Sequence, residues 1–176
     1  MRAIVARVLL LVLLALPRTS AAQSSSVRPA LDWMTVRTRY FDVHYPAPMA
    51  EWVRDLSTRL DAVHDAVSAL VGYAPRARIT VIVEDPLNDS NGFANSPLGD
   101  PLIVLWPTPP DPSGMLGVYR DWSELVAVHE YAHVAHLSRP SRSARERWFW
   151  RFIPIRLGPV ALRTPRWAVE GYATYV

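Results

Sequence analysis

Two histidines and a glutamate lie close together in the segment His129-Glu130-Tyr131-Ala132-His133. In a helix, residues four apart project from the same side one turn apart, so the imidazoles of His129 and His133 can bind one zinc ion. Glu130 lies about 100° around the helix from His129, beside such an ion, where a carboxylate can take a proton from water. The composition of the chain gives about 0.005 expected chance matches to this motif. The segment therefore predicts a zinc site with Glu130 as the base of a hydrolytic reaction.

A catalytic zinc ion usually has three protein ligands and one open position. The chain contains no cysteine, so the third ligand must come from a histidine or an acid. Glu170 is the predicted third ligand, because it lies near the start of a predicted helix beside Gly171, which would let another helix come close. His136 lies on the same predicted helix, where ligation of one ion by three histidines from one straight helix is strained, and it is predicted to be a neighbouring or capping residue. The remaining histidines, predicted to be structural, are His44 and His64.

The elements that precede the motif are short strands and one long helix. Alternating or β-branched apolar runs predict strands at Val36–Tyr45, Arg78–Glu84 and Leu102–Trp106. Between the first two, an apolar stripe with helical spacing predicts a helix that ends at Gly72. The stripe consists of Trp52, Leu56, Leu60, Val63, Val67 and Leu70. Residues 85–101 are predicted to form a loop, because they are rich in proline, asparagine, aspartate and glycine.

Two further helices must position the zinc ligands. The motif helix is predicted to run from Asp121, which can cap it, to Leu137, since Pro140 prevents its continuation. A connection over residues 139–165, rich in arginine and tryptophan, separates it from a third helix that begins after Pro165. The predicted order of elements, β-α-β-β-α-α, indicates an α+β domain with a small mixed sheet.

The first 22 residues have the layout of a secretory signal peptide. Arg2 and Arg7 precede an apolar run of nine residues, Val8–Leu16. Nine helical residues span about 14 Å, which is too short for a bilayer core of about 30 Å. No later stretch is long and apolar enough to span a membrane. We therefore predict a signal peptide over residues 1–22, a flexible leader over 23–34, and a folded domain over 35–176. The mature protein is predicted to be exported to the periplasm or cell envelope, or secreted.

The net charge of +3 is contributed by the signal peptide, which contains three arginines and no acid. The remainder of the chain contains 16 arginines and 16 acidic residues, so it is neutral. No predicted face combines a basic stripe with aromatic residues, and we expect no nucleic-acid partner.

A second motif, Trp167-x-x-Glu170-Gly171-x-Ala173, follows the first. Together the two motifs resemble the gluzincin zinc metallopeptidases, which include thermolysin-like enzymes and aminopeptidases with such a glutamate helix. They look most like the peptidase-MA-like domains of bacterial envelope proteins, which often precede a TolB-type β-propeller. The resemblance implies a zincin-like fold, a Zn²⁺ cofactor held by His129, His133 and Glu170, and a C-terminal β-propeller as a partner domain in the full-length protein. It also implies a peptide or protein substrate that pairs with an edge strand, for which Leu102–Trp106 is the predicted strand.

Two functions remain open at this point. One is a zinc metallopeptidase, and the other is a zinc-binding, non-hydrolytic interaction module of a larger envelope protein. Glu130 favours the peptidase, because an interaction module requires no acid there. The last predicted helix is still uncapped at Val176, so we expect the domain to continue beyond it, with the oxyanion-stabilising residue in that part.

The connection between the motifs must loop out and return, since 36 residues separate His133 from Glu170. Its aromatic residues are expected to pack against a further part of the protein, the alternative being contact with a membrane or a partner domain. These residues are Trp148, Phe149, Trp150 and Phe152.

Overall fold

The structure is a computed structural model that describes residues 30–95, 100–114, 121–150, 152 and 158–176. The predicted signal peptide and most of the predicted leader lie outside the described residues. The strands are β1 (Trp33–Arg37), β2 (Phe41–Pro46), β3 (Ile79–Val83), β4 (Gly92–Asn95) and β5 (Leu102–Leu105). The helices are η1 (Ala47–Met49), α2 (Ala50–Val71), α3 (Trp122–Leu137), α4 (Ala144–Trp150), α5 (Pro159–Arg163) and α6 (Arg166–Tyr175).

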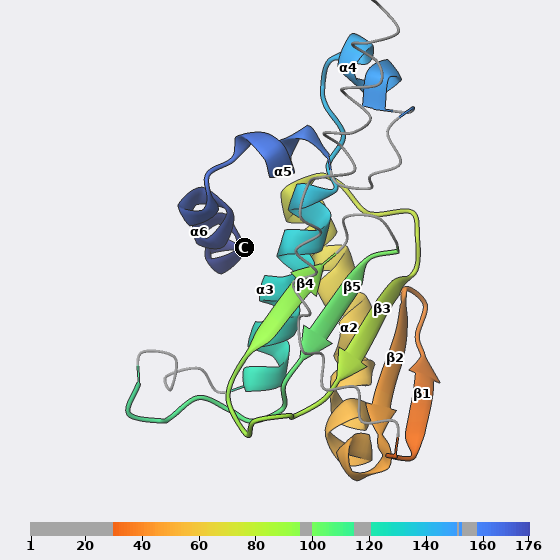
Figure 1. Cartoon of the computed structure of the whole chain (residues 1–176), viewed down its shortest axis with the longest axis vertical. Coiled ribbons are helices and arrows are strands. Elements are labelled where there is room, and N and C mark those ends of the chain that lie inside the picture. The colour runs from red at the N-terminus through yellow and green to blue at the C-terminus, as the bar shows by residue number, and fades with distance from the viewer. Residues whose placement is uncertain (1–29, 96–99, 115–120, 151, 153–157) are drawn as a thin grey trace, which may run out of the picture.

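The five strands form one mixed sheet in the order β1-β2-β3-β5-β4. The three inner strands are parallel, and the two outer strands are antiparallel to their neighbours. Helices α2 and α3 pack side by side against one face of this sheet (Figure 1). The α+β class and the mixed sheet that we predicted are therefore confirmed.

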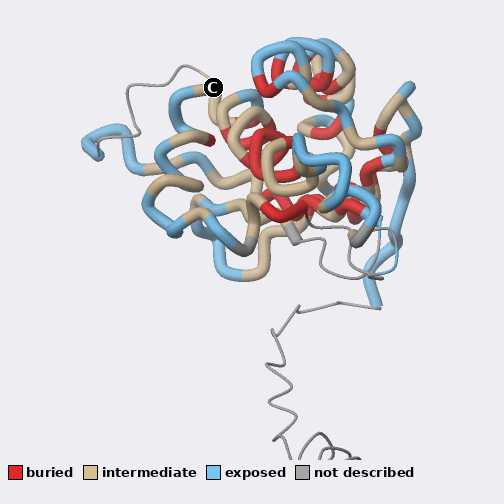
Figure 2. The backbone as a smooth tube through the Cα atoms, turned by 90° about the horizontal axis from the view of Figure 1, so that it is seen from above, coloured by how far each residue is buried: buried red, intermediate tan, exposed pale blue. Residues whose placement is uncertain are grey.

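The core lies between the sheet and these two helices. Strand β3 alternates between buried and half-buried residues, as expected for a strand with one face on the core. Figure 2 shows the buried residues gathered between the helices and the sheet, with exposed segments around the outside. The bulkiest fully buried side chains include Tyr131 of α3, Phe41 of β2 and Leu56 of α2. In the part of the chain that the structure describes, no helix is long and apolar enough to cross a membrane.

Helix α2 ends where predicted, but its buried stripe differs at both ends. Gly72 adopts φ = 71° and donates its N–H to the Ser68 carbonyl, a left-handed helix end that favours glycine. Val53 and Val71 are buried, whereas Leu70 is 65% exposed. Apolar residues stand next to each other at both ends of the helix, so spacing alone could not decide which of them faces the core.

Three strand predictions need correction. The first predicted strand is a hairpin of two strands, and β1 already begins at Trp33, within the predicted leader. Strand β4 lies within the segment that was predicted to be a loop. It was not predicted as a strand because its four residues show no apolar alternation. The prediction that Leu102–Trp106 forms the edge strand is wrong: β5 pairs with β3 on one side and with β4 on the other. The edge beside α3 is formed by β4.

Candidate metal centre

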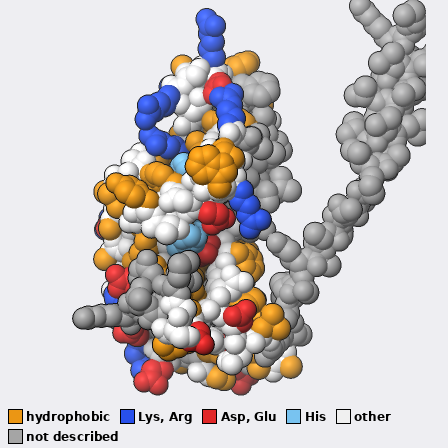
Figure 3. Space-filling view, turned by 90° about the vertical axis from the view of Figure 1, so that its left-hand side faces the viewer, with side chains coloured by type: hydrophobic (Ala, Val, Ile, Leu, Met, Phe, Trp, Pro, Cys, Tyr) orange, Lys and Arg blue, Asp and Glu red, His pale blue; other side chains and the backbone are white. Residues whose placement is uncertain are grey.

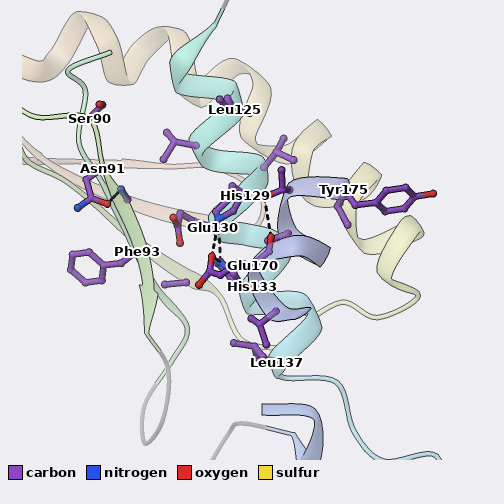
Figure 4. Close-up of a pocket in the computed structure, with 18 of the residues that line it drawn as sticks. Ser90, Asn91, Phe93, Leu125, His129, Glu130, His133, Leu137, Glu170 and Tyr175 are labelled. Carbon is purple, nitrogen blue, oxygen red and sulfur yellow. Dashed lines mark hydrogen bonds and ion pairs between the residues drawn. The ribbon is translucent and has the colours of Figure 1, made fainter. Parts of the chain in front are cut away.

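Helices α3 and α6 bring the three predicted ligand residues together (Figure 4). The Nε2 atoms of His129 and His133 lie 3.2 Å apart. The Oε2 atom of Glu170 lies 3.5 Å from Nε2 of His129 and 3.3 Å from Nε2 of His133. Ligand atoms about 2.0–2.1 Å from a tetrahedral ion lie about 3.3 Å from one another. The three atoms have the spacing of one face of such a tetrahedron, and this group can hold a metal ion.

The chemistry of these donors also fits a cation. All three atoms have lone pairs, and a shared positive charge makes their close approach favourable. Burial, followed by the neighbouring imidazole of His129, lowers the pKa of His133 against the opposing effect of Glu170. The lowered pKa favours the neutral form of His133, the state in which an imidazole binds a metal. The Glu170 side chain is 47% exposed, so the site is open towards solvent on its side.

Glu130 lies beside the three donors but points towards β4 (Figure 4). It is only 5% exposed. Burial, and secondarily the charge of Glu170, raise its pKa to about 7, although a hydrogen bond from the backbone of Ala94 opposes the shift. A carboxyl group with a pKa near neutrality can both accept and return a proton at that pH.

Strand β4 can approach Glu130 this closely because residue 92 is a glycine. A Cβ atom at Gly92 would lie 2.6 Å from Cγ2 of Val126 and 3.0 Å from Oε1 of Glu130. The roles of Gly92 and Ala94 were not predicted from the sequence. A glycine within a short strand often marks the close approach of another group, and this was the available signal.

The 36-residue connection loops out and returns at the end of α3, as expected. It contains α4 and α5, and Gly158 closes it by donating its N–H to the Leu137 carbonyl over 2.6 Å. A Cβ atom at Gly158 would lie 1.9 Å from the Arg139 carbonyl oxygen, so only glycine fits. Helix α6 then begins after Pro165, as predicted, and turns Glu170 towards α3.

The predicted role of Gly171 is wrong. No atom lies within 4 Å of a Cβ atom built there, and Ala173 is the α6 residue that is buried. His136 lies outside the donor group, as predicted, and its ring packs on Tyr172 of α6 with 4.2 Å between centroids. This contact helps to dock α6 on the end of α3.

The two other histidines have structural contacts away from the centre. His44 forms a hydrogen bond with Thr35 on the neighbouring strand. His64 is 5% exposed, and its ring stacks between those of Tyr40 and Tyr131. Neither residue belongs to the group that can hold a metal ion.

The candidate centre lies in an open groove of about 820 Å³. Residues of β4, α3 and α6 line it, including Phe93 and Tyr175 together with the three donors and Glu130. Figure 3 shows histidine and acidic side chains next to each other near the middle of this face. The Ala94 N–H binds Glu130 and therefore points away from β5. In a strand, every second residue directs its N–H and C=O groups to the same side, so the N–H and C=O groups of Gly92 and Ala94 both face the groove.

Comparisons with models of protein families, with curated proteins and with solved structures found no match. The inference of function therefore depends on the donor set, its spacing and the groove around it.

Proposed function

We propose that this protein is an exported zinc metallopeptidase of the gluzincin type. His129, His133 and Glu170 hold the zinc ion, and Glu130 is the catalytic base. The observation that supports this most is the spacing of 3.2–3.5 Å among the three donor atoms, with the buried Glu130 carboxyl group next to them. Two imidazoles and one carboxylate with an open fourth position are a typical donor set of catalytic zinc.

The division of roles follows from the positions of the side chains. When bound, zinc polarises the scissile carbonyl group and lowers the pKa of a water molecule. Glu130 takes the proton of the attacking water and returns it to the leaving amine, a role that suits a buried carboxyl group beside the three donors. The hydrogen bond from Ala94 orients the carboxylate, because it holds Glu130 towards the groove.

Strand β4 is the proposed binding strand for an extended substrate. It takes the place that we had predicted for Leu102–Trp106, since β4 lies at the edge of the sheet and lines the groove. A peptide can add to such an edge by donating backbone hydrogen bonds, here to the groove-facing carbonyl groups of Gly92 and Ala94, because the Ala94 N–H binds Glu130 and the Gly92 N–H binds the Asn91 side chain. Export is attributed to residues 1–22, whose sequence has the pattern of a signal peptide.

The test is to replace Glu130 with glutamine and to measure both zinc content and peptide hydrolysis. Zinc content should stay near one ion per chain, because all three ligands remain. Activity should fall by about 10²–10⁴-fold, the usual contribution of a general base. Glu51→Gln is the matched control, since Glu51 is exposed in the first turn of α2.

Two results would contradict the proposal in different ways. A Glu130→Gln variant as active as the wild type would exclude the role of Glu130. A wild-type protein that binds zinc but cleaves no member of a broad peptide library would instead support the zinc-binding interaction module.

A further inference from the structure

A basic and aromatic surface lies at the end of the molecule that is formed by α4 and α5, beyond the end of α3 (Figure 1). We define it by five described residues, Arg142, Arg145, Trp148, Phe152 and Arg163, and call it the α4 surface. Trp148 is 62% exposed and Phe152 is 69% exposed. Their rings contact each other, with centroids 4.9 Å apart. Two large aromatic side chains thus form one apolar patch outside the core.

The α4 surface is continuous across two helices. Arg163 of α5 forms an ion pair with Glu146 of α4 at 2.7 Å, which holds the two helices together. Arg145 and Trp148 are three residues apart and therefore neighbours on one side of α4. Figure 3 shows arginine and hydrophobic side chains together at the upper end of the face that also contains the groove.

The charge of this region differs strongly from that of the rest of the chain. Residues 139–169 contain eight arginines and one acidic residue, whereas residues 23–138 contain eight arginines and 14 acidic residues. The overall neutrality of the mature chain conceals this concentration. Arg142 and Arg145 form no ion pair with any described residue, so their charges are available to a partner.

These two properties together specify the chemistry of the partner. The aromatic patch needs an apolar environment, and the surrounding arginines need negative charge. A lipid bilayer with anionic headgroups provides both, because tryptophan settles at the membrane interface and arginine binds lipid phosphates. We propose that the α4 surface docks the protein on an anionic membrane without spanning it.

Docking would place the groove beside the membrane. Helix α6 follows α5 directly, and its first turn adds the exposed Trp167. The same helix positions Glu170 in the candidate metal centre. The proposal does not depend on peptidase activity, since it rests on the exposure and charge of residues outside that centre.

The first experiment measures co-flotation of the purified mature chain with vesicles. One set contains phosphatidylcholine alone, and the other contains 30% phosphatidylglycerol. We expect binding to the anionic vesicles that weakens as salt is added, because salt screens exposed charges. Arg142→Gln with Arg145→Gln should weaken binding about 25-fold, since one arginine near an anionic surface is worth about fivefold.

The aromatic pair is tested separately. Trp148→Ala with Phe152→Ala should weaken binding at least about tenfold, because apolar side chains leave water on docking. The matched controls are exposed residues on other elements: Leu70→Ala with Leu87→Ala for the apolar pair, and Arg54→Gln with Arg76→Gln for the charged pair. Both controls should bind as the wild type does.

A second measurement reports which surface meets the membrane. Since the chain contains no cysteine, Ser143→Cys gives a single site for an environment-sensitive dye at the start of α4. Ala66→Cys gives a matched site on the exposed side of α2. We expect a blue shift with anionic vesicles for the dye at residue 143 and none for the dye at residue 66.

Each of the following results would overturn the proposal. Equal binding to both kinds of vesicle would exclude the role of anionic lipid. Loss of binding in the control variants to the same extent would exclude the α4 surface. Absence of vesicle binding, combined with self-association that the aromatic substitutions abolish, would assign the surface to contact between protein chains. Tighter binding to a DNA oligonucleotide than to the vesicles would assign it to nucleic acid.

Discussion

At the scale of single residues, Glu170 differs from the other two donors in burial and in origin. Its side chain is 47% exposed, whereas that of His133 is 10% exposed, and it comes from α6 instead of α3. Because the Glu170 carboxylate is well exposed to solvent, burial does not by itself require it to have a metal or ion-pair partner. What assigns Glu170 to the centre is the distance of its Oε2 atom from the two imidazoles.

We predict that Glu170→Gln weakens zinc binding by at least about 10–100-fold, the loss that changes around a metal typically cause. The reason is that a neutral amide oxygen replaces a charged donor. Competition with a chelator measures the affinity, and Glu51→Gln should leave it unchanged. A larger loss from His136→Ala than from Glu170→Gln would transfer the ligand role to His136.

Gly92 sets the distance between β4 and α3. We predict that Gly92→Ala destabilises the protein by about 1–3 kcal/mol, because the added methyl group collides with Val126 and Glu130. Peptide hydrolysis should fall more than zinc binding does, since β4 moves while the ligands stay in place. Chemical denaturation, zinc titration and activity assays measure the three effects.

Gly171→Ala is the control for this substitution. Nothing lies within 4 Å of a Cβ atom there, and alanine favours a helix over glycine by about 1 kcal/mol. Its stability should be equal to or greater than that of the wild type. A Gly92→Ala variant that is as stable and as active would show that the close approach of β4 is unimportant.

At the scale of elements, the start of α3 is held by a network that joins it to α2. Asp121 accepts a hydrogen bond from the Glu124 backbone N–H and caps the helix. Arg59 of α2 forms ion pairs with Asp121 and Glu124 and also bonds Ser123. The cap was predictable from local sequence, whereas the contact with Arg59 joins residues that lie 62 positions apart.

This network makes stability depend on pH. Burial raises the pKa of Asp121, but hydrogen bonds from Ser123, Arg59 and the Glu124 backbone outweigh it and lower the pKa to about 2. The ordinary pKa of an unfolded aspartate is about 3.9. The stabilisation by the carboxylate is therefore fully present above about pH 4 and is lost as the pH falls through about 2.

We predict that Asp121→Ala lowers the free energy of unfolding by about 1–2 kcal/mol at pH 7. The difference from the wild type should shrink between pH 4 and pH 2. Denaturant unfolding over this range measures it, with Asp32→Ala as an exposed control. A difference that stays constant down to pH 2 would exclude the charged form of Asp121 as its cause.

At the scale of the whole molecule, the candidate centre joins α3 to α6, two helices that are separated in the chain by the long connection that contains α4 and α5. Helices α2 and α3 share a large buried core with the sheet, whereas Ala173 is the buried residue of α6. The contact between Tyr172 and His136 adds to the docking of α6. Because α6 has one buried residue, we expect its local stability to be lower than that of α2 unless its carboxylate is bound by a metal.

We therefore predict that a chelator increases hydrogen exchange in residues 166–175 much more than in residues 50–71. A metal ion that binds only the native arrangement stabilises it by mass action. The stabilisation is about 4 kcal/mol when the free metal concentration is a thousand times the dissociation constant. Exchange measured by mass spectrometry with zinc and with chelator tests this. Equal changes in α2 and α6, or none in either, would contradict the metal link between α3 and α6.

The sequence by itself determined the features that depend on near neighbours in the chain. The motif helix and its Asp121 cap, the end of α2 at Gly72, strand β3 and the start of α6 after Pro165 follow from spacing and capping chemistry over a few residues. The choice of the three donor residues followed from the four-residue spacing of the histidines and from the place of Glu170 near the start of a predicted helix, in the motif Trp167-x-x-Glu170-Gly171-x-Ala173.

Only the tertiary structure decided what depends on contacts between distant segments. It placed β4 instead of β5 at the sheet edge, assigned close approach to Gly92 and Gly158 instead of Gly171, and brought Arg163 of α5 against Glu146 of α4. The physical reason is that strand order and steric fit are set by partners remote in sequence. A local pattern describes which surfaces a segment offers, but which neighbour meets each surface is decided by the packing of the whole chain.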